Sequence, residues 1–400
     1  MEKRIYPGTV LCFFGKGVCG MAGKRKKTAS ARRTGKRILR CFLICLPFYI
    51  LAGLARLLSI WARTHSSWVE EVFSEKLYPG YAQAVSSVTG IFPFSLAEVL
   101  LCLLSTAFVI LFFYFLFFRI RRFIPFLCIC LAVCSFLYAQ YICTWQLHYS
   151  RLPYAQIRSY PQAVTDREHL TGLCEDLAQQ INLLRDGHAE SENGTYLMAE
   201  TKPEILSMVP DIYAQSSDLF PELDGKYAAP KGVLLSGGLS RLQITGIFIP
   251  HTIEANVNRQ EVPWAFPFTA CHESAHQRGF AREDEANYIA YEACINGDSE
   301  DFRYSGLFMG FLYAGNALYK ADSEAYFRVY RSLCEGARRD IRAYDEFWSQ
   351  FEGKPAEIEE KINDTYLKAN QQSDGVLSYD RMIELLVARF EKYGSCIDIT

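Results

Sequence analysis

Three long apolar runs dominate the first 150 residues, over residues 38–61, 94–118 and 123–145. Each has about the 20 apolar residues that an α-helix needs to cross a bilayer. A cleaved signal peptide is the alternative for the first run, but that run is long and no small-x-small cleavage site follows it. The pattern therefore predicts a three-span transmembrane anchor over residues 38–148, with the lipid bilayer as a partner.

Charge around these runs sets the expected orientation. The first forty residues hold twelve Lys and Arg against one acid, Glu2, and three Arg lie in the turn at 119–122. Short basic segments next to membrane spans stay on the cytoplasmic side. We therefore expect residues 1–37 to be a disordered basic cytoplasmic tail and residues 149–400 to lie outside the cytoplasm, in a multi-pass protein of the cell membrane. The net charge of −2 gives no reason to expect a nucleic-acid partner.

The remaining 250 residues have the pattern of a soluble, mainly α domain with a small sheet. Leucines and Ile181 recur at helical spacing over 166–185, and β-branched residues before Pro250 predict a strand over 242–249. The fourth apolar run, over 305–319, is too short for a membrane span and predicts a buried core helix. Further helices are expected over 202–215, 266–278, 282–296, 324–344, 355–368 and 378–392, with loops over 62–93 and 251–267.

The most informative stretch is His272-Glu273-Ser274-Ala275-His276, the pattern H-E-x-x-H. On a helix, His272 and His276 leave the same face one turn apart, so that both ring nitrogens can bind one zinc ion. Glu273 is then placed as the general base that acts on a metal-activated water. Gly279 suits the left-handed end of such a helix.

Zinc needs a third protein ligand, and the next helix offers two acids. We favour Glu283, because it shares a face of small residues with Asn287 that can pack closely on the first helix; Glu285 is the alternative. Asn287 is a candidate hydrogen-bond partner for a liganding His. Further candidates for the cleft are His251, Glu254, Asn256 and Tyr291, and the donor to the oxyanion stays open among His251, Arg278, Tyr291 and Tyr304.

This stretch resembles the Glu-zincin metallopeptidases, although they commonly space the third ligand further along the chain. Similarity extends over most of the chain to a bacterial family of membrane zincins known as domain of unknown function 3810. It is carried by residues 149–153, 246–250, 272–280 and 363–368, besides the three spans. The resemblance implies a zincin-like fold for residues 149–400 and no established substrate.

Together these features predict a membrane-anchored zinc metallopeptidase that hydrolyses peptides or envelope proteins, with the strand at 242–249 aligning the substrate. The alternative is a zinc-stabilised, non-catalytic envelope binding or scaffold protein. Glu273 favours the enzyme, since a scaffold needs no general base.

Overall fold

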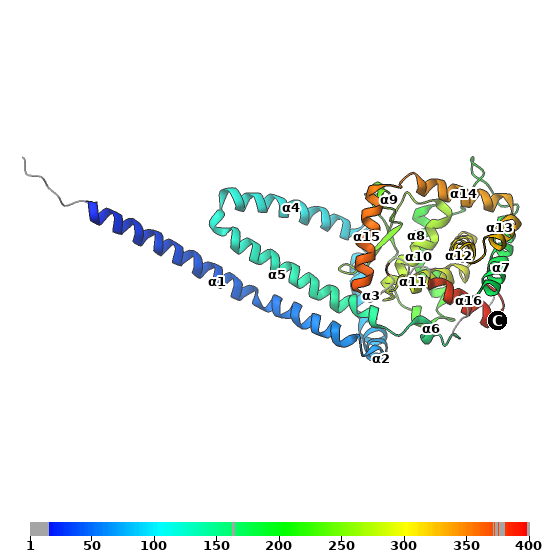
Figure 1. Ribbon diagram of the computed structural model, residues 1–400, viewed down its shortest axis with the longest axis horizontal. Coiled ribbons are helices and arrows are strands. Elements are labelled where there is room, and N and C mark those ends of the chain that lie inside the picture. Colours follow the sequence, from blue (N-terminus) through cyan, green and yellow to red (C-terminus); the bar gives the residue numbers. More distant parts are fainter. Residues whose placement is uncertain (1–15, 162–164, 371, 373–374, 376–380, 398–400) are drawn as a thin grey trace, which may run out of the picture. The chain divides into compact units, whose positions relative to one another are not determined.

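The computed structural model of the 400-residue chain describes residues 16–161, 165–370, 372, 375 and 381–397 (Figure 1). It divides into two compact units. One comprises the described residues up to Gly53 together with Thr106–Tyr138, and the other comprises Leu54–Ser105 and the described residues from Ala139 onward. The candidate site lies wholly within the second unit.

Three helices are long and apolar enough to cross a membrane. They are α1 (Lys16–Ala62), α4 (Leu96–Phe118) and α5 (Ile120–Thr144), and the apolar part of α1 begins at Thr34. These helices confirm the three predicted apolar segments. The predicted tail differs: residues 1–15 lie outside the described part, but from Lys16 onward the chain is helical rather than disordered. Ala, Lys and Arg are good helix formers, and extending an existing helix costs far less than starting one.

The connection between the first two apolar helices, expected as a loop, is also helical. It contains α2 (Ser66–Trp68), the π-helical segment η1 (Val69–Leu77) and α3 (Tyr78–Thr89). Val69, Phe73 and Tyr78 are buried in one apolar cluster with Trp145 and Tyr149. The connection is helical because it packs one apolar face against the domain that carries the site.

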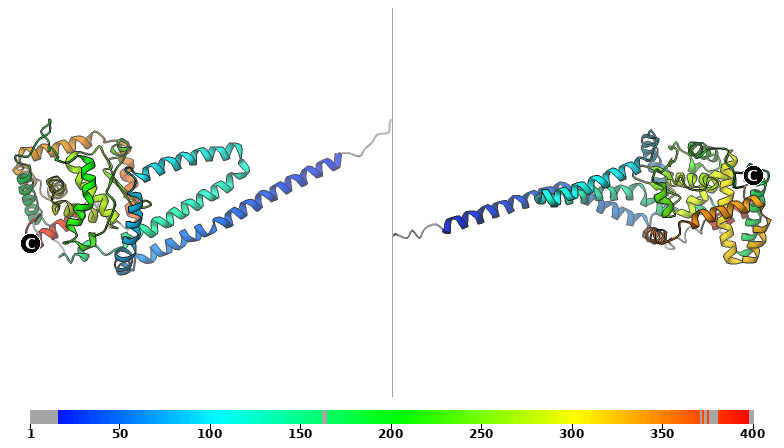
Figure 2. Two further views of the ribbon diagram at one scale, coloured as in Figure 1. Left: turned by 180° about the vertical axis from the view of Figure 1, so that it is seen from behind. Right: turned by 90° about the horizontal axis from the view of Figure 1, so that it is seen from above.

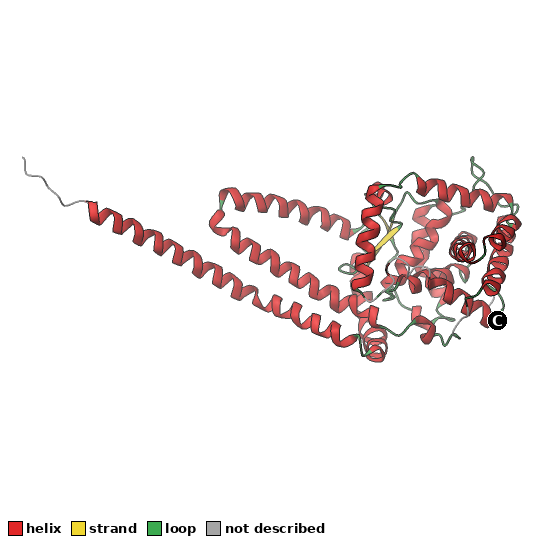
Figure 3. Cartoon of the chain, in the orientation of Figure 1, coloured by secondary structure: helices red, strands yellow, loops and turns green. Residues whose placement is uncertain are grey.

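That domain is built mainly from helices (Figure 3). They surround α12 (Glu300–Ala321), whose buried position confirms the predicted core helix (Figures 1 and 2). The predicted helix at 324–344 is divided in two, as α13 and α14. The other helices are η2 (Gln146–Ser150), α6 (Tyr154–Ile157), α7 (Arg167–Arg185), α8 (Lys202–Ser216), η3 (Pro221–Leu223), α9 (Ser236–Arg241), η4 (Pro263–Ala265), α10 (Phe266–Gln277), α11 (Glu283–Ile295), α13 (Ser323–Ser332), α14 (Glu335–Ser349), α15 (Lys354–Ala369) and α16 (Met382–Tyr393).

A three-stranded sheet completes the domain, in the order β1-β3-β2. The central strand β3 (Glu254–Val257) pairs in parallel with β1 (Lys231–Gly232) and antiparallel with β2 (Gly246–Ile249), with Gly246 opposite Val257. The loop prediction for 251–267 was therefore wrong in part, because buried Glu254 and Asn256 interrupt the apolar signal of a central strand. The predicted strand at 242–249 exists in its second half, and among the described residues it forms an edge of the sheet.

Candidate metal centre

Helix α10 presents both histidines of the motif on one face. It begins with Pro267 in its first turn, and nearly all its residues are buried. The rings of His272 and His276 lie edge to face with centroids 4.6 Å apart. Burial of the rest of the helix fixes its rotation, so these two rings are held at the same side of it.

The chain then reverses within six residues. Gly279 has φ +85°, and its backbone N–H donates to the His276 carbonyl at 2.9 Å. Phe280 N–H donates back to Ala275 O at 3.3 Å, which closes the end of α10. Helix α11 can therefore begin at Glu283, and the acidic residues of its first turn interact favourably with the helix dipole.

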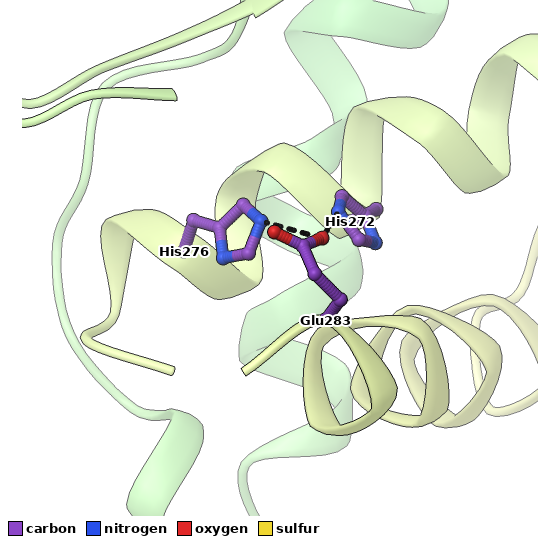
Figure 4. A group of neighbouring side chains, drawn as sticks. All are labelled: His272, His276 and Glu283. Carbon is purple, nitrogen blue, oxygen red and sulfur yellow. Dashed lines mark ion pairs between the residues drawn. The ribbon is translucent and has the colours of Figure 1, made fainter. Parts of the chain in front are cut away.

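Glu283 is the residue that the turn brings to the two histidines (Figure 4). Its Oε2 lies 3.3 Å from His272 Nε2 and 3.5 Å from His276 Nε2. One donor atom from each of the three residues can be chosen so that all lie within 4.8 Å of one another. Two imidazoles and one carboxylate, with space left for a water, are the donor set of catalytic zinc sites, and the residues present therefore fit that ion.

Neighbouring groups orient the two rings. His276 Nδ1 lies 2.7 Å from the Phe280 carbonyl, which fixes the proton on that nitrogen and leaves Nε2 to face Glu283. The indole of Trp145 packs edge-on against the His276 ring at 5.4 Å between centroids. Asn287, the expected partner of a liganding His, lines the same cavity as His272, but no described group hydrogen-bonds His272 Nδ1 or Asn287 Nδ2.

The electrostatics of the cluster follow from burial and mutual charge. Burial lowers the pKa of His272, with a smaller opposite effect from Glu283. Burial also disfavours imidazolium at His276, but Glu283 outweighs it and raises the pKa of His276 to about 9. The charge of His276, aided by His272, holds the pKa of Glu283 well below its usual range against the effect of burial. Glu283 is thus held as a carboxylate, and His276 must lose its Nε2 proton before that nitrogen can bind a metal ion.

Glu273 lies beside this cluster, between α10 and the edge strand. A Cβ at Gly246 would come within 2.7 Å of Glu273 Cγ, so only glycine permits this approach. The Glu273 side chain is buried, and no described group hydrogen-bonds its Oε2. Burial raises the pKa of Glu273 to about 8, which places its protonation near neutrality.

The cluster opens into a cavity of about 610 Å³. His272, Glu273, His276 and Glu283 lie along one wall, and all four residues of β2 lie along another. Helix α15 contributes Glu359, Asn363 and Tyr366, and His251 also lines the space as expected. The motif and the edge strand therefore face one common cavity.

Aromatic residues of this cavity were missed by sequence reasoning. They are Tyr141, Trp145, Tyr149, Phe268, Tyr313, Tyr344 and Tyr366, and Tyr366 Oη accepts from Trp145 Nε1 at 3.0 Å. Tyr149 and Tyr366 belong to the segments that carried the family resemblance. That resemblance was the sequence signal that could have indicated their place in the cavity.

Several candidates from the sequence do not face the cavity. Glu285 accepts from Arg282 Nη1 at 2.6 Å and from Tyr154 N–H at 2.8 Å, both away from the histidines. Glu254 accepts from the Leu96 and Ala97 N–H groups and forms an ion pair with Lys231. Asn256 Nδ2 donates within the sheet to Ile247 O, and Tyr291 Oη donates to Cys396 O in the core.

Two of the residues considered as oxyanion donors are also engaged elsewhere. Arg278 is buried between the rings of Tyr213 and Tyr227 and donates to Leu223 O. The hydroxyl of Tyr304 donates to Asp340 in the core. The expectation that these residues face the cavity was wrong, because residue spacing alone does not show which side of a buried element faces it.

Comparison with known proteins places the chain in a family without a known function. A family described as "Protein of unknown function (DUF3810)" matches residues 73–387, well over half of the chain. No curated protein and no solved structure matches this chain. The matched region contains the turn at Gly279, the edge strand and the whole candidate centre, and the chain belongs to the DUF3810 family.

Proposed function

We propose that this protein is a membrane-anchored zinc metallopeptidase with a zincin-like domain. The observation that carries the proposal is the position of Glu273, a buried carboxyl with an unpartnered oxygen. It lies next to a His-His-Glu donor set and faces the same cavity as an edge strand. A zinc-stabilised scaffold gives no reason to hold such a carboxyl there, because an unsatisfied buried oxygen is destabilising.

His272, His276 and Glu283 are the residues that hold the ion in this proposal. Zinc supplies a bound water of lowered pKa and a Lewis acid for a carbonyl oxygen. Glu273 accepts the proton of the attacking water and then gives it to the departing amine.

The edge strand β2 supplies the substrate alignment. An extended peptide adds to the open edge of a sheet through main-chain hydrogen bonds, independent of its sequence. Because Gly246 contacts Glu273, a peptide paired with β2 passes directly beside the proposed base. The hydroxyls of Tyr149 and Tyr366 line the same cavity and replace Arg278, Tyr291 and Tyr304 as candidate donors to the oxyanion.

The proposed location is outside the cytoplasm. It rests on the basic residues before the first apolar helix and in the short turn between α4 and α5, which the positive-inside rule assigns to the cytoplasm. Three crossings then put the domain on the opposite face of the membrane, where envelope peptides and proteins are the available substrates.

Metal analysis and peptide cleavage on the full chain in detergent test the proposal. We expect the wild type to contain zinc and to cleave members of a mixed peptide library, detected by mass spectrometry. Glu273→Gln should keep zinc and lose turnover, whereas His272→Ala should lose both. Glu384→Gln, at an exposed position of α16, is the matched control. A wild type without zinc, or a Glu273→Gln variant as active as the wild type, would refute the proposal.

A further inference from the structure

The compact unit that holds the cavity also holds one end of each candidate membrane span. It contains residues 54–62 of α1, 96–105 of α4 and 139–144 of α5. These are the ends that lie on a single side of the membrane when three consecutive helices cross it. The relation between these ends and the cavity therefore determines how far the site lies from the bilayer.

The last turn of α5 forms part of the cavity itself. Tyr141 lies within α5 and lines the cavity, and Trp145 follows directly after the helix and packs on His276. Tyr and Trp are the residues that concentrate where a membrane span meets water. A wall of the site is thus built from the residue types and the helix end that mark a membrane surface.

The far end of β2 is bound to the same helix end. His251, two residues beyond β2, has its Nδ1 2.7 Å from Gln140 Oε1, and its carbonyl accepts from Gln140 Nε2 at 3.3 Å. At its other end β2 contacts Glu273 through Gly246. A peptide that pairs with β2 therefore extends from the proposed base toward the end of a membrane span.

The start of α4 is attached to the sheet in a similar way. Glu254 of β3 accepts from the N–H groups of Leu96 and Ala97 at 2.9 and 2.7 Å, which caps the first turn of α4. Glu98 in that turn accepts from Leu234 and Leu235 N–H, and both leucine side chains are 62% exposed. A pair of exposed leucines fixed to the first turn of a membrane span is suited to enter the lipid headgroup region.

We infer that the site acts at the bilayer surface on membrane-tethered polypeptides, cleaving segments within a few residues of their membrane anchor. The inference rests on the proposed peptidase function and specifies its substrate class. The edge strand contacts Glu273 at one end, and at its other end His251 bonds to Gln140. It takes up an extended segment that leaves the membrane beside α5. Freely soluble peptides lack the anchor that places them there.

Proteoliposomes that hold the full chain together with tethered substrates test the inference. One peptide sequence that the protein cleaves is joined to a single transmembrane helix by flexible linkers of about 5, 15 and 40 residues, which span at most roughly 17, 50 and 140 Å. Surface density is kept equal, and Glu273→Gln is the inactive reference. We expect the shortest linker to be cleaved at least as fast as the longest.

The outcomes separate this inference from the proposed function. Slower cleavage of the shortest linker than of the longest, or cleavage of the soluble peptide alone, overturns the inference and leaves the peptidase intact. No Glu273-dependent cleavage of any substrate removes both. Leu234→Glu with Leu235→Glu should slow the short-linker substrate several-fold and leave the soluble peptide unaffected. Leu183→Glu, on a similarly exposed leucine of α7, is the control, and an equal slowing by this change and by the double change would contradict the role of the leucine pair.

Discussion

The imidazole of His148 lies directly against the backbone of Gly279. A Cβ at residue 279 would come within 2.6 Å of His148 Cε1, and the ring cannot easily move because it contacts Phe73 and Tyr78. Its Nδ1 is also 3.1 Å from Ser74 Oγ. The turn that returns Glu283 to the histidines thus requires glycine both for its positive φ and for its lack of a side chain.

Gly279→Ala should lower the free energy of unfolding by on the order of 3 kcal/mol, from backbone strain plus overpacking against His148. Denaturant unfolding of the purified protein measures this loss. Gly394→Ala is the matched control, because Gly394 has φ +71° but open space around its Cβ position. It should show only the backbone strain of about 1–2 kcal/mol. Equal losses in the two variants would mean that the contact with His148 contributes nothing.

Sequence reasoning succeeded where the signal was local. The spacing of His272 and His276, followed by a glycine and an acid, is contained within twelve residues, and the helices α7, α10 and α11 follow from periodicity and end signals. The positions of these three donor groups depend mainly on one helix, one turn and the next helix, all of which are readable from adjacent residues.

It failed where the structure depends on distant pairs. Tyr149 and Tyr366 meet at 3.3 Å between hydroxyls although 217 residues separate them, and no local pattern indicates such a contact. Glu254 and Asn256 have the polarity of cleft residues but belong to a buried strand. There, Glu254 accepts a hydrogen bond from the Leu96 N–H in the first turn of α4. The role of Glu254 is set by α4, which lies more than 150 residues earlier in the chain.

Glu283 and Glu285 differ in what they contact, and this difference can be measured by zinc binding. Loss of a residue that hydrogen-bonds a metal ligand typically lowers metal affinity about 10- to 100-fold. Glu283→Ala removes a ligand itself and should lower zinc affinity by more than that. Glu285→Ala should keep zinc but lose about 1–3 kcal/mol of stability, because the Tyr154 N–H and the Arg282 guanidinium lose their acceptor. Competition with a chromophoric chelator gives the affinities. Zinc lost in Glu285→Ala and retained in Glu283→Ala would reverse the assignment.

Arg151 links the helical connection at 62–93 to the turn after α10. It forms a buried ion pair with Glu70 at 2.6 Å and donates to Gly279 O at 3.0 Å. Arg151→Met should therefore cost about 3–5 kcal/mol in unfolding experiments, since it leaves a buried carboxylate without its cation. Adding Glu70→Gln to that variant should recover part of the loss, because the unpaired charge is removed.

The exposed pair of Arg338 and Glu335, at 2.8 Å, provides the comparison. Arg338→Met should change stability by at most about 1 kcal/mol, as is usual for surface ion pairs. If the losses from Arg151→Met and Glu70→Gln simply add in the double variant, the two residues do not act as a pair.

Glu261 should make the stability of the domain depend on pH. Its burial raises the pKa to about 8, although a hydrogen bond from Thr269 and the charge of Lys202 act in the opposite direction. The ordinary value, expected in the unfolded chain, is 4.5. Because the folded state holds the proton more tightly, this contribution to stability is complete below about pH 4.5 and is lost progressively as the pH rises through about 8.

Glu261→Gln should remove this dependence, because the amide is neutral throughout and its oxygen can still accept from Thr269 Oγ1, which lies 3.0 Å from Oε1 in the wild type. We expect the variant and the wild type to unfold at similar temperatures at pH 5, and the variant to be more stable by a few kcal/mol at pH 8. Melting curves recorded with a chelator present exclude the pH dependence of zinc binding. If the melting temperatures of the wild type and the variant change with pH in the same way, Glu261 does not hold its proton in the folded state.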